Sequence, residues 1–189
     1  NFVDTLYWIA VPLYLVSQGL GIAAVGVVVG VHSAMYFLQI ATGGLADRIG
    51  RRPPVILGMF TAGAGVLGLV LVEGYLPWAV FAGVSGLGMA LLYPNLMTVP
   101  SDAAHPTWRS AGMGVYRMWR DSGYAVGAVV IGVSMEFVNA EAAFYVTAGL
   151  MFLSGAVVYL WMEETHAEFG THELPVPATA GPETVATED

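Results

Sequence analysis

Long apolar stretches alternate with short polar breaks along most of the chain. Six apolar segments can be drawn, each ending at turn residues or charges: about 2–17, 22–43, 54–72, 76–99, 112–135 and 142–162. A hydrocarbon core about 30 Å thick requires roughly 20 apolar residues of helix. The pattern therefore predicts an all-α, polytopic membrane protein with a bundle of six transmembrane helices over residues 1–166. Residues 167–189 are rich in Pro, Thr and Glu, and we expect them to form a disordered acidic cytoplasmic tail.

The composition supports burial in lipid. Hydrophobic residues make up 57% of the 189 residues and charged residues only 11%, against about 25% charged in soluble domains. There is no cysteine, so no disulfide or thiolate metal site can form, and no lysine, so a Walker A phosphate loop is excluded. The formal charge of −8 comes largely from the tail and argues against a nucleic-acid partner. We expect the lipid bilayer as a partner, and neither a cofactor nor a metal.

Arginine placement predicts the orientation of the bundle. Basic residues follow the second and the fourth apolar segments, whereas the loops after the first, third and fifth segments carry none. The arginines concerned are Arg48, Arg51 and Arg52, and then Arg109, Arg117 and Arg120. Because short cytoplasmic loops retain basic residues, both ends of the bundle are predicted to be cytoplasmic.

The most specific string is GGLADRIGRR, residues 43–52, between the second and third segments. It resembles the loop signature of the major facilitator superfamily. The matching positions are Gly44, Asp47, Arg48, Gly50, Arg51 and Arg52. Gly50 permits a tight turn, Asp47 can face a helix N-terminus and gate the cytoplasmic side, and the arginines hold the loop at the cytoplasmic face.

Two further stretches carry the same resemblance. Residues 108–127 look like the entry to the fifth helix of the second half in prokaryotic members, and Asn1–Leu15, with Asp4, Trp8 and Pro12, looks like their seventh helix. The resemblance implies helices seven to twelve of a twelve-helix protein in the cytoplasmic membrane of a prokaryote, a three-plus-three inverted repeat whose N-terminal six-helix half precedes Asn1. Since this loop signature is usually more complete in the first half, the assignment of the half stays open at this stage.

The function implied by the resemblance is secondary active transport of a small solute by alternating access. Proton coupling is expected, and aromatic residues with few fixed charges in the spans favour an efflux permease for an amphipathic compound. A membrane enzyme is disfavoured, because HExxH and GxSxG motifs are absent and His32 is the one histidine in a span. A non-transporting assembly or sensor subunit would show the same lipid-facing pattern and remains an alternative.

Polar residues inside the spans are the candidate substrate or proton path, because ionisable groups in lipid are costly. Helical spacing places two sets on one face each. The first set is Asp4, Tyr7, Tyr14 and Gln18, and the second is His32, Tyr36 and Gln39. The alternative is that Tyr and Gln satisfy each other between helices while Asp4 sits at the membrane interface.

Three charged residues form a second candidate cluster on the cytoplasmic side. Arg117 and Asp121 are one helical turn apart and are predicted to pair, with Arg120 adjacent. A structural ion pair and a gating role are both open. In the fourth segment, Pro94 predicts a kink because it removes a backbone hydrogen bond. Small residues four apart, such as Gly26 and Gly30, predict close helix packing.

Overall fold

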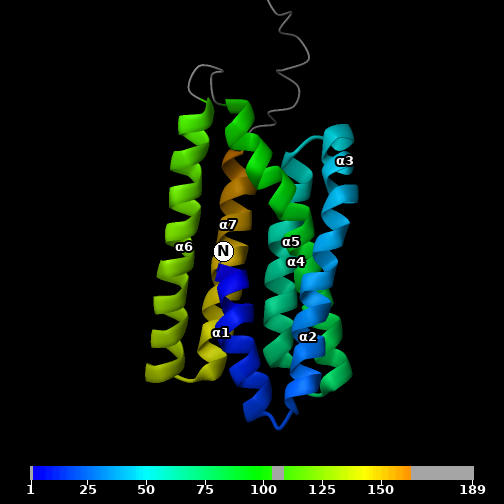
Figure 1. Cartoon of the computed structure of the whole chain (residues 1–189), viewed down its shortest axis with the longest axis vertical. Helices are drawn as coiled ribbons and strands as arrows, with labels where there is room; N and C mark the ends of the chain where they lie inside the picture. Colours follow the sequence, from blue (N-terminus) through cyan, green and yellow to red (C-terminus); the bar gives the residue numbers. More distant parts are fainter. Residues whose placement is uncertain (1, 104–108, 163–189) are drawn as a thin grey trace, which may run out of the picture.

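The computed structural model describes residues 2–103 and 109–162, except for the side chains of residues 47, 99–103 and 109. Every regular element in this part of the chain is helical, and the helices run along a common axis (Figure 1). They are α1 (Phe2–Ser17), α2 (Ile22–Ala34), η1 (Met35–Leu38), α3 (Gln39–Ile49), α4 (Arg52–Leu71), α5 (Tyr75–Ala103), α6 (Arg109–Phe137) and α7 (Ala140–Trp161). Because α2, η1 and α3 follow one another without a break, the all-α six-helix bundle is confirmed.

Four helical stretches are long and apolar enough to cross a membrane. They are Ile22–Ala46, Arg52–Leu71, Tyr75–Thr98 and Ala140–Trp161. The remaining two differ from the predicted pattern: α1 is apolar but has only 16 residues, and α6 carries Arg117, Arg120 and Asp121 in its first half. The predicted tail, residues 167–189, lies outside the described residues.

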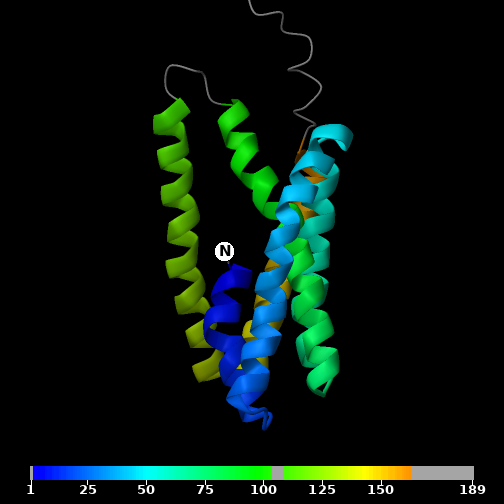
Figure 2. The same cartoon turned by 45° about the vertical axis from the view of Figure 1, so that its right-hand side comes forward.

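The pairs α4–α5 and α4–α7 make the most extensive helix contacts in the described part of the bundle. One side of α4 lies against α5 and another against α7, and α2 packs on the far side of α5. α1 contacts α2, α6 and α7. It begins about halfway along the bundle, and beyond that point the ribbon of α5 leans towards that of α6 (Figure 2). The α3–α4 turn and the start of α6 lie at the same end of the bundle (Figure 1).

Glycine allows the closest approach between α4 and α5. A Cβ atom at Gly88 would collide with the backbone of Ala62. Small residues at such crossings let helices pack backbone to backbone where lipid offers no hydrophobic driving force. The predicted packing at Gly26 and Gly30 is wrong for the described part of this chain, because no heavy atom lies within 4 Å of a Cβ built at either position. Those two glycines lie on the outer face of α2.

Pro94 leaves one carbonyl of α5 without its usual backbone donor, and a side chain of α3 takes that place. The carbonyl of Ala90 sits one turn before Pro94, which has no N–H to donate to it. The hydroxyl of Thr42 in α3 donates to this carbonyl instead, at 2.7 Å, and Ala90 is fully buried. The ribbon of α5 changes direction in its second half, as the predicted kink requires (Figure 1). The unsatisfied carbonyl thus becomes an interhelical contact.

The outer surface of the bundle is apolar. Trp8, Phe37 and Ile40 are 78%, 82% and 88% exposed. Soluble monomers rarely expose apolar patches of such extent. The arrangement is that of an integral membrane protein, in which these side chains contact lipid or a further membrane segment.

Candidate functional site

Asp4, in the first turn of α1, is a carboxylate buried among tyrosines from three other helical elements. It is 6% exposed. The Tyr36 hydroxyl, from η1, donates to Asp4 Oδ1 at 2.6 Å. The hydroxyls of Tyr93 in α5 and Tyr124 in α6 lie 3.2 and 3.4 Å from Oδ2 and 2.8 Å from each other, so one of them can donate to Oδ2 while the other donates to its neighbour. Together with His32 these residues are called the Asp4 cluster below. It ties four helical elements to one carboxylate.

His32 extends the cluster towards the interior of the bundle. Its Nε2 atom lies 3.1 Å from the Tyr36 oxygen, and the ring is 2% exposed. The ring stacks on Tyr7 with centroids 3.6 Å apart and an angle of 13° between the planes. Asp4, Tyr7, His32 and Tyr36 were all candidates from helical spacing, and the structure brings them together across two helices.

The tyrosines of the cluster can stabilise a negative charge on Asp4 through hydrogen bonds. An ionised carboxylate accepts hydrogen bonds at about four lone-pair positions, and the phenols supply donors for them. Each charge-assisted hydrogen bond is stronger than a neutral one. Adding a proton to Asp4 would turn one of its oxygens into a donor, so at least one tyrosine would have to reorient.

Three predicted path residues lie away from the cluster. Tyr14 packs on Phe144 of α7 at 5.0 Å between ring centroids. Gln18 is exposed in the turn after α1. Gln39 begins α3, and among the described residues its side chain makes no hydrogen bond to the cluster. For Gln39 the cause is η1, a 3₁₀ segment that rotates the residues after it away from the face occupied by His32.

Two cluster members were missed as site residues. They are Tyr93 and Tyr124, which are not among the path residues predicted from the sequence. Each lies on a different helix from Asp4, so no spacing rule within one helix could join them. A tyrosine hydroxyl in the middle of an apolar span, which must find a partner when buried, was the available signal.

The loop signature is a helix-to-helix turn. Gly50 ends α3 with φ of 87°, a conformation that other residues adopt only with strain, as its place in the signature predicts. Arg52 Nη2 donates to the carbonyl of Tyr159 at 2.6 Å, and its guanidinium carbon lies 5.8 Å from the centre of that ring. This arginine fastens the start of α4 to the end of α7.

The rest of the signature lies around that turn. Gly44 and Arg48 are exposed on α3. Arg51 lines a small cavity with Pro94 and Asn95 of α5. The Asp47 side chain, for which a gating contact is predicted, lies outside the described residues.

The predicted pair between Arg117 and Asp121 is wrong. Asp121 instead accepts from Nε of the adjacent Arg120 at 2.9 Å. Arg117 is exposed, whereas Arg120 turns inwards, and its Nη1 atom contacts the sulfur of Met97 at 3.7 Å. Asp121 itself stays 59% exposed, and its carboxylate pairs with the adjacent arginine rather than with the one a turn away.

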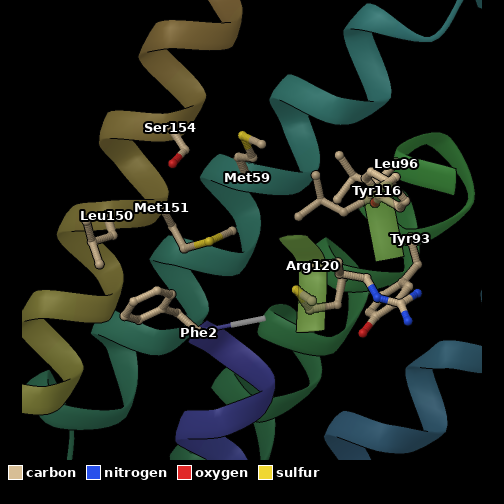
Figure 3. Close-up of a pocket in the computed structure, with 11 residues that line it drawn as sticks. Phe2, Met59, Tyr93, Leu96, Tyr116, Arg120, Leu150, Met151 and Ser154 are labelled. Atoms are coloured by element: carbon tan, nitrogen blue, oxygen red, sulfur yellow. The ribbon is translucent and has the colours of Figure 1, made fainter. Parts of the chain in front are cut away.

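A cavity of about 200 Å³ lies beside the Asp4 cluster, between α4, α5, α6 and α7 (Figure 3). Three methionines, three leucines and Phe2 form most of its wall, and its polar groups are Tyr93, Tyr116, Arg120 and Ser154. Phe2, in the first turn of α1, lies at its edge (Figure 3). Among the described residues, no group of three or more His, Cys, Asp or Glu side chains could hold a metal.

The sequence has clear relatives. The model of the Major Facilitator Superfamily matches residues 1–183. The multidrug resistance protein MdtH of Aeromonas hydrophila is 28% identical over 131 residues, which are 69% of this chain and 30% of that protein. The inner membrane transport protein YnfM of Escherichia coli is 26% identical over 156 residues, covering 78% of this chain and 37% of that protein.

The helical arrangement also has counterparts among solved structures. A crystal structure of a mutant of the peptide transporter POT, in complex with alafosfalin, matches with a TM-score of 0.70 at 27% identity. The match covers 84% of this chain and 36% of that chain. The chain thus spans about a third of the length of these relatives.

Proposed function

Because the chain belongs to the major facilitator superfamily of membrane transporters, we propose that it is the second six-helix half of a proton-coupled secondary transporter, with Asp4 as the proton-binding group. The observation that carries this proposal is the buried carboxylate held by tyrosines from η1, α5 and α6. An ionisable residue at membrane depth is expensive, and such residues mark ion and substrate pathways.

The Asp4 cluster can link proton binding to helix movement. The ionised form of Asp4 is stabilised by the phenols hydrogen-bonded to it and to one another, and therefore holds α1, η1, α5 and α6 together. The protonated form needs fewer donors, so these contacts weaken when a proton binds. A ligand that favours one arrangement of contacts over another shifts the population between two conformations. Proton binding and release at Asp4 then alternate the two arrangements that transport requires.

The proposed orientation rests on which end of the bundle carries arginine. Arg48, Arg51 and Arg52 lie around the α3–α4 turn, at the same end as the start of α6, and this end faces the cytoplasm in the proposal. The α4–α5 connection, which contains Glu73, and the end of α6, which contains Glu136, lie at the opposite end (Figure 1). Both termini of the chain are then cytoplasmic, in the inner membrane of a prokaryote. A preceding six-helix half would complete the central cavity, because family members bind solute between two halves.

Export of an amphipathic compound is the favoured activity. One relative is a multidrug resistance protein, and the spans of this chain combine aromatic residues with few fixed charges. The similarity to a peptide transporter makes uptake of a small peptide the competing substrate class. Both classes fit a site built from one carboxylate and several phenols, so the experiment must include a probe for each.

Flux in proteoliposomes tests the proposal. The full-length protein is reconstituted, a pH gradient is imposed, and transport of ethidium and of alanyl-alanine is followed. Asp4→Asn should abolish gradient-driven accumulation of the transported probe yet retain its exchange at equal pH, since exchange requires no net proton movement. Asp4→Glu should retain part of the driven flux. Equal loss of driven flux and exchange in Asp4→Asn, or loss of neither, would remove Asp4 from the coupling role.

A further inference from the structure

The Asp4 cluster has a direction, because each tyrosine has only one proton to donate. Tyr36 uses its proton in the 2.6 Å hydrogen bond to Asp4 Oδ1. Its oxygen is therefore the acceptor for His32 Nε2, 3.1 Å away. The proton of a neutral imidazole must then sit on Nε2, which leaves the lone pair on Nδ1. The hydrogen bonds run one way, from His32 through Tyr36 to Asp4.

The free lone pair of His32 lies in a buried polar pocket. His32 Nδ1, Tyr7 Oη and Ser85 Oγ are all buried and lack a hydrogen bond of good geometry among the described residues, although Tyr7 faces Ser85 and His32 faces the backbone of Ala82. Tyr7 stacks on the His32 ring, and Ser85 precedes Gly86, which packs against the His32 backbone. Buried polar groups without protein partners are commonly joined by an ordered water molecule. These atoms can hold one next to the imidazole.

We infer that His32 is the proton-entry group for Asp4. A proton binds Nδ1 of His32, and Nε2 releases its own proton to the Tyr36 oxygen. Tyr36 passes its original proton to Asp4 Oδ1. The balance is one proton gained by the carboxylate, with the imidazole left as the Nδ1–H tautomer and Tyr36 again neutral. Return of the ring to the Nε2–H tautomer resets the chain.

The path to Asp4 through His32 and Tyr36 differs chemically from the path through Tyr93 and Tyr124. The titratable groups that face it are Asp4 and Tyr7 from α1 and Tyr36 from η1, with Tyr93 of α5 packed against Tyr36. Beyond Asp4 on the α5 and α6 side, the described hydrogen bonds lead only through phenols, which hold their protons near neutral pH. Among the residues described here, His32 is the one imidazole, and its two ring nitrogens can take up one proton while releasing another.

The inference rests on the proposed proton-coupled transport, and the test separates the two. His32→Gln keeps an amide N–H that can donate to Tyr36 but removes the titrating ring, and Tyr36→Phe removes the link to Asp4. Both should lower gradient-driven flux by about a hundredfold, the low end for removal of one proton-transfer group, while exchange at equal pH is retained. Tyr14→Phe is the matched control, because Tyr14 is a buried tyrosine of α1, the helix that carries Asp4, and lies outside the cluster.

The outcomes are distinct. Wild-type protein without driven flux of either probe would refute the proposed function. Driven flux that is lost in Asp4→Asn but intact in His32→Gln, with an unchanged pH profile, would overturn the role of His32 and leave the function standing. Loss in Tyr14→Phe as severe as in His32→Gln would also overturn it, since the effect would then follow from disturbed packing.

The tautomer gives a readout that does not depend on flux. Protein labelled with ¹⁵N-histidine is measured in lipid bilayers by solid-state NMR, and the His32 signal is identified by its loss in His32→Gln. Wild type should show the Nε2–H tautomer at alkaline pH, and Tyr36→Phe should lose that preference because Nε2 loses its acceptor. An Nδ1–H tautomer in the wild type would contradict the direction of the chain.

Discussion

The hydrogen bond between Thr42 and the Ala90 carbonyl should be energetically coupled to Pro94. Thr42→Val keeps the shape of the side chain but removes the donor, so the buried carbonyl of Ala90 is left without a partner. Loss of one interhelical hydrogen bond in a membrane protein costs about 0.6 kcal/mol on average and up to about 1.7. The upper part of that range is expected here, because proline has already removed the backbone donor. A loss near 1.4 kcal/mol is about tenfold in the folding equilibrium.

Pro94→Ala supplies the missing half of the test. It restores an N–H at the position from which Ala90 is normally satisfied in a helix, so Thr42→Val should then cost little. The predicted coupling energy of the double-mutant cycle is about 1 kcal/mol. Thr147→Val is the matched control: its hydroxyl bonds the carbonyl of Ala143 one turn earlier in the same helix, where the backbone donor is present. This variant should change stability by only a few tenths of a kcal/mol.

Reversible unfolding by SDS in mixed micelles, followed by tryptophan fluorescence of the full-length protein, measures all five species. The reasoning is refuted if Thr42→Val costs the same with Pro94 as with alanine at that position, because the hydroxyl would then not replace the missing N–H. A Thr147→Val cost as large as that of Thr42→Val would refute it as well, since any buried hydroxyl would then serve equally.

Three further predictions concern packing, gating and orientation. Gly88→Ala should destabilise the bundle by about 1 to 3 kcal/mol in the same unfolding assay, whereas Gly149→Ala, with no heavy atom within 4 Å of its Cβ position, should change stability by less than about 0.5. Asp47→Asn should leave the amount of protein in the membrane unchanged but make cytoplasmic-side cysteines more accessible; normal abundance with unaltered accessibility would remove its gating role. A single cysteine at Arg51 should react with impermeant reagents only from the cytoplasm, and one at Asn139 only from outside. The reverse pattern would show that the proposed orientation of the bundle is wrong.

The helices could be predicted from hydropathy because each must satisfy its own backbone in lipid. Helical spacing also found Asp4, His32 and Tyr36, since residues three or four apart share a face over the first turns of each span. Gln39 was assigned to that face on the assumption of uninterrupted α-helix, which η1 violates.

The rest of the site depends on how separate helices meet. Tyr93 and Tyr124 reach Asp4 only because α5 and α6 approach α1, and no periodicity within one segment encodes that approach. Arg117 and Asp121 satisfy the one-turn spacing, but Asp121 pairs with its neighbour Arg120 instead. Side-chain direction is a property of the packed bundle, so spacing rules for a single helix cannot reach it.

The 3₁₀ segment η1 also sets the rotation of α3 relative to α2 about the axis of the continuous helical rod that α2, η1 and α3 form. A 3₁₀ helix turns about 120° per residue and an α-helix about 100°, so four residues twist α3 by about 80° and lengthen the rod by about 2 Å relative to continuous α-helix. Tyr36, inside this segment, is tied to Asp4. Rewinding of η1 as α-helix after that tie is released would swing the far end of α3, with Arg48 and the Gly50 turn, around the rod axis. The hydrogen bond from Tyr36 to Asp4 would then fix the angle at which the Gly50 turn, some four helical turns away, lies around the helix axis.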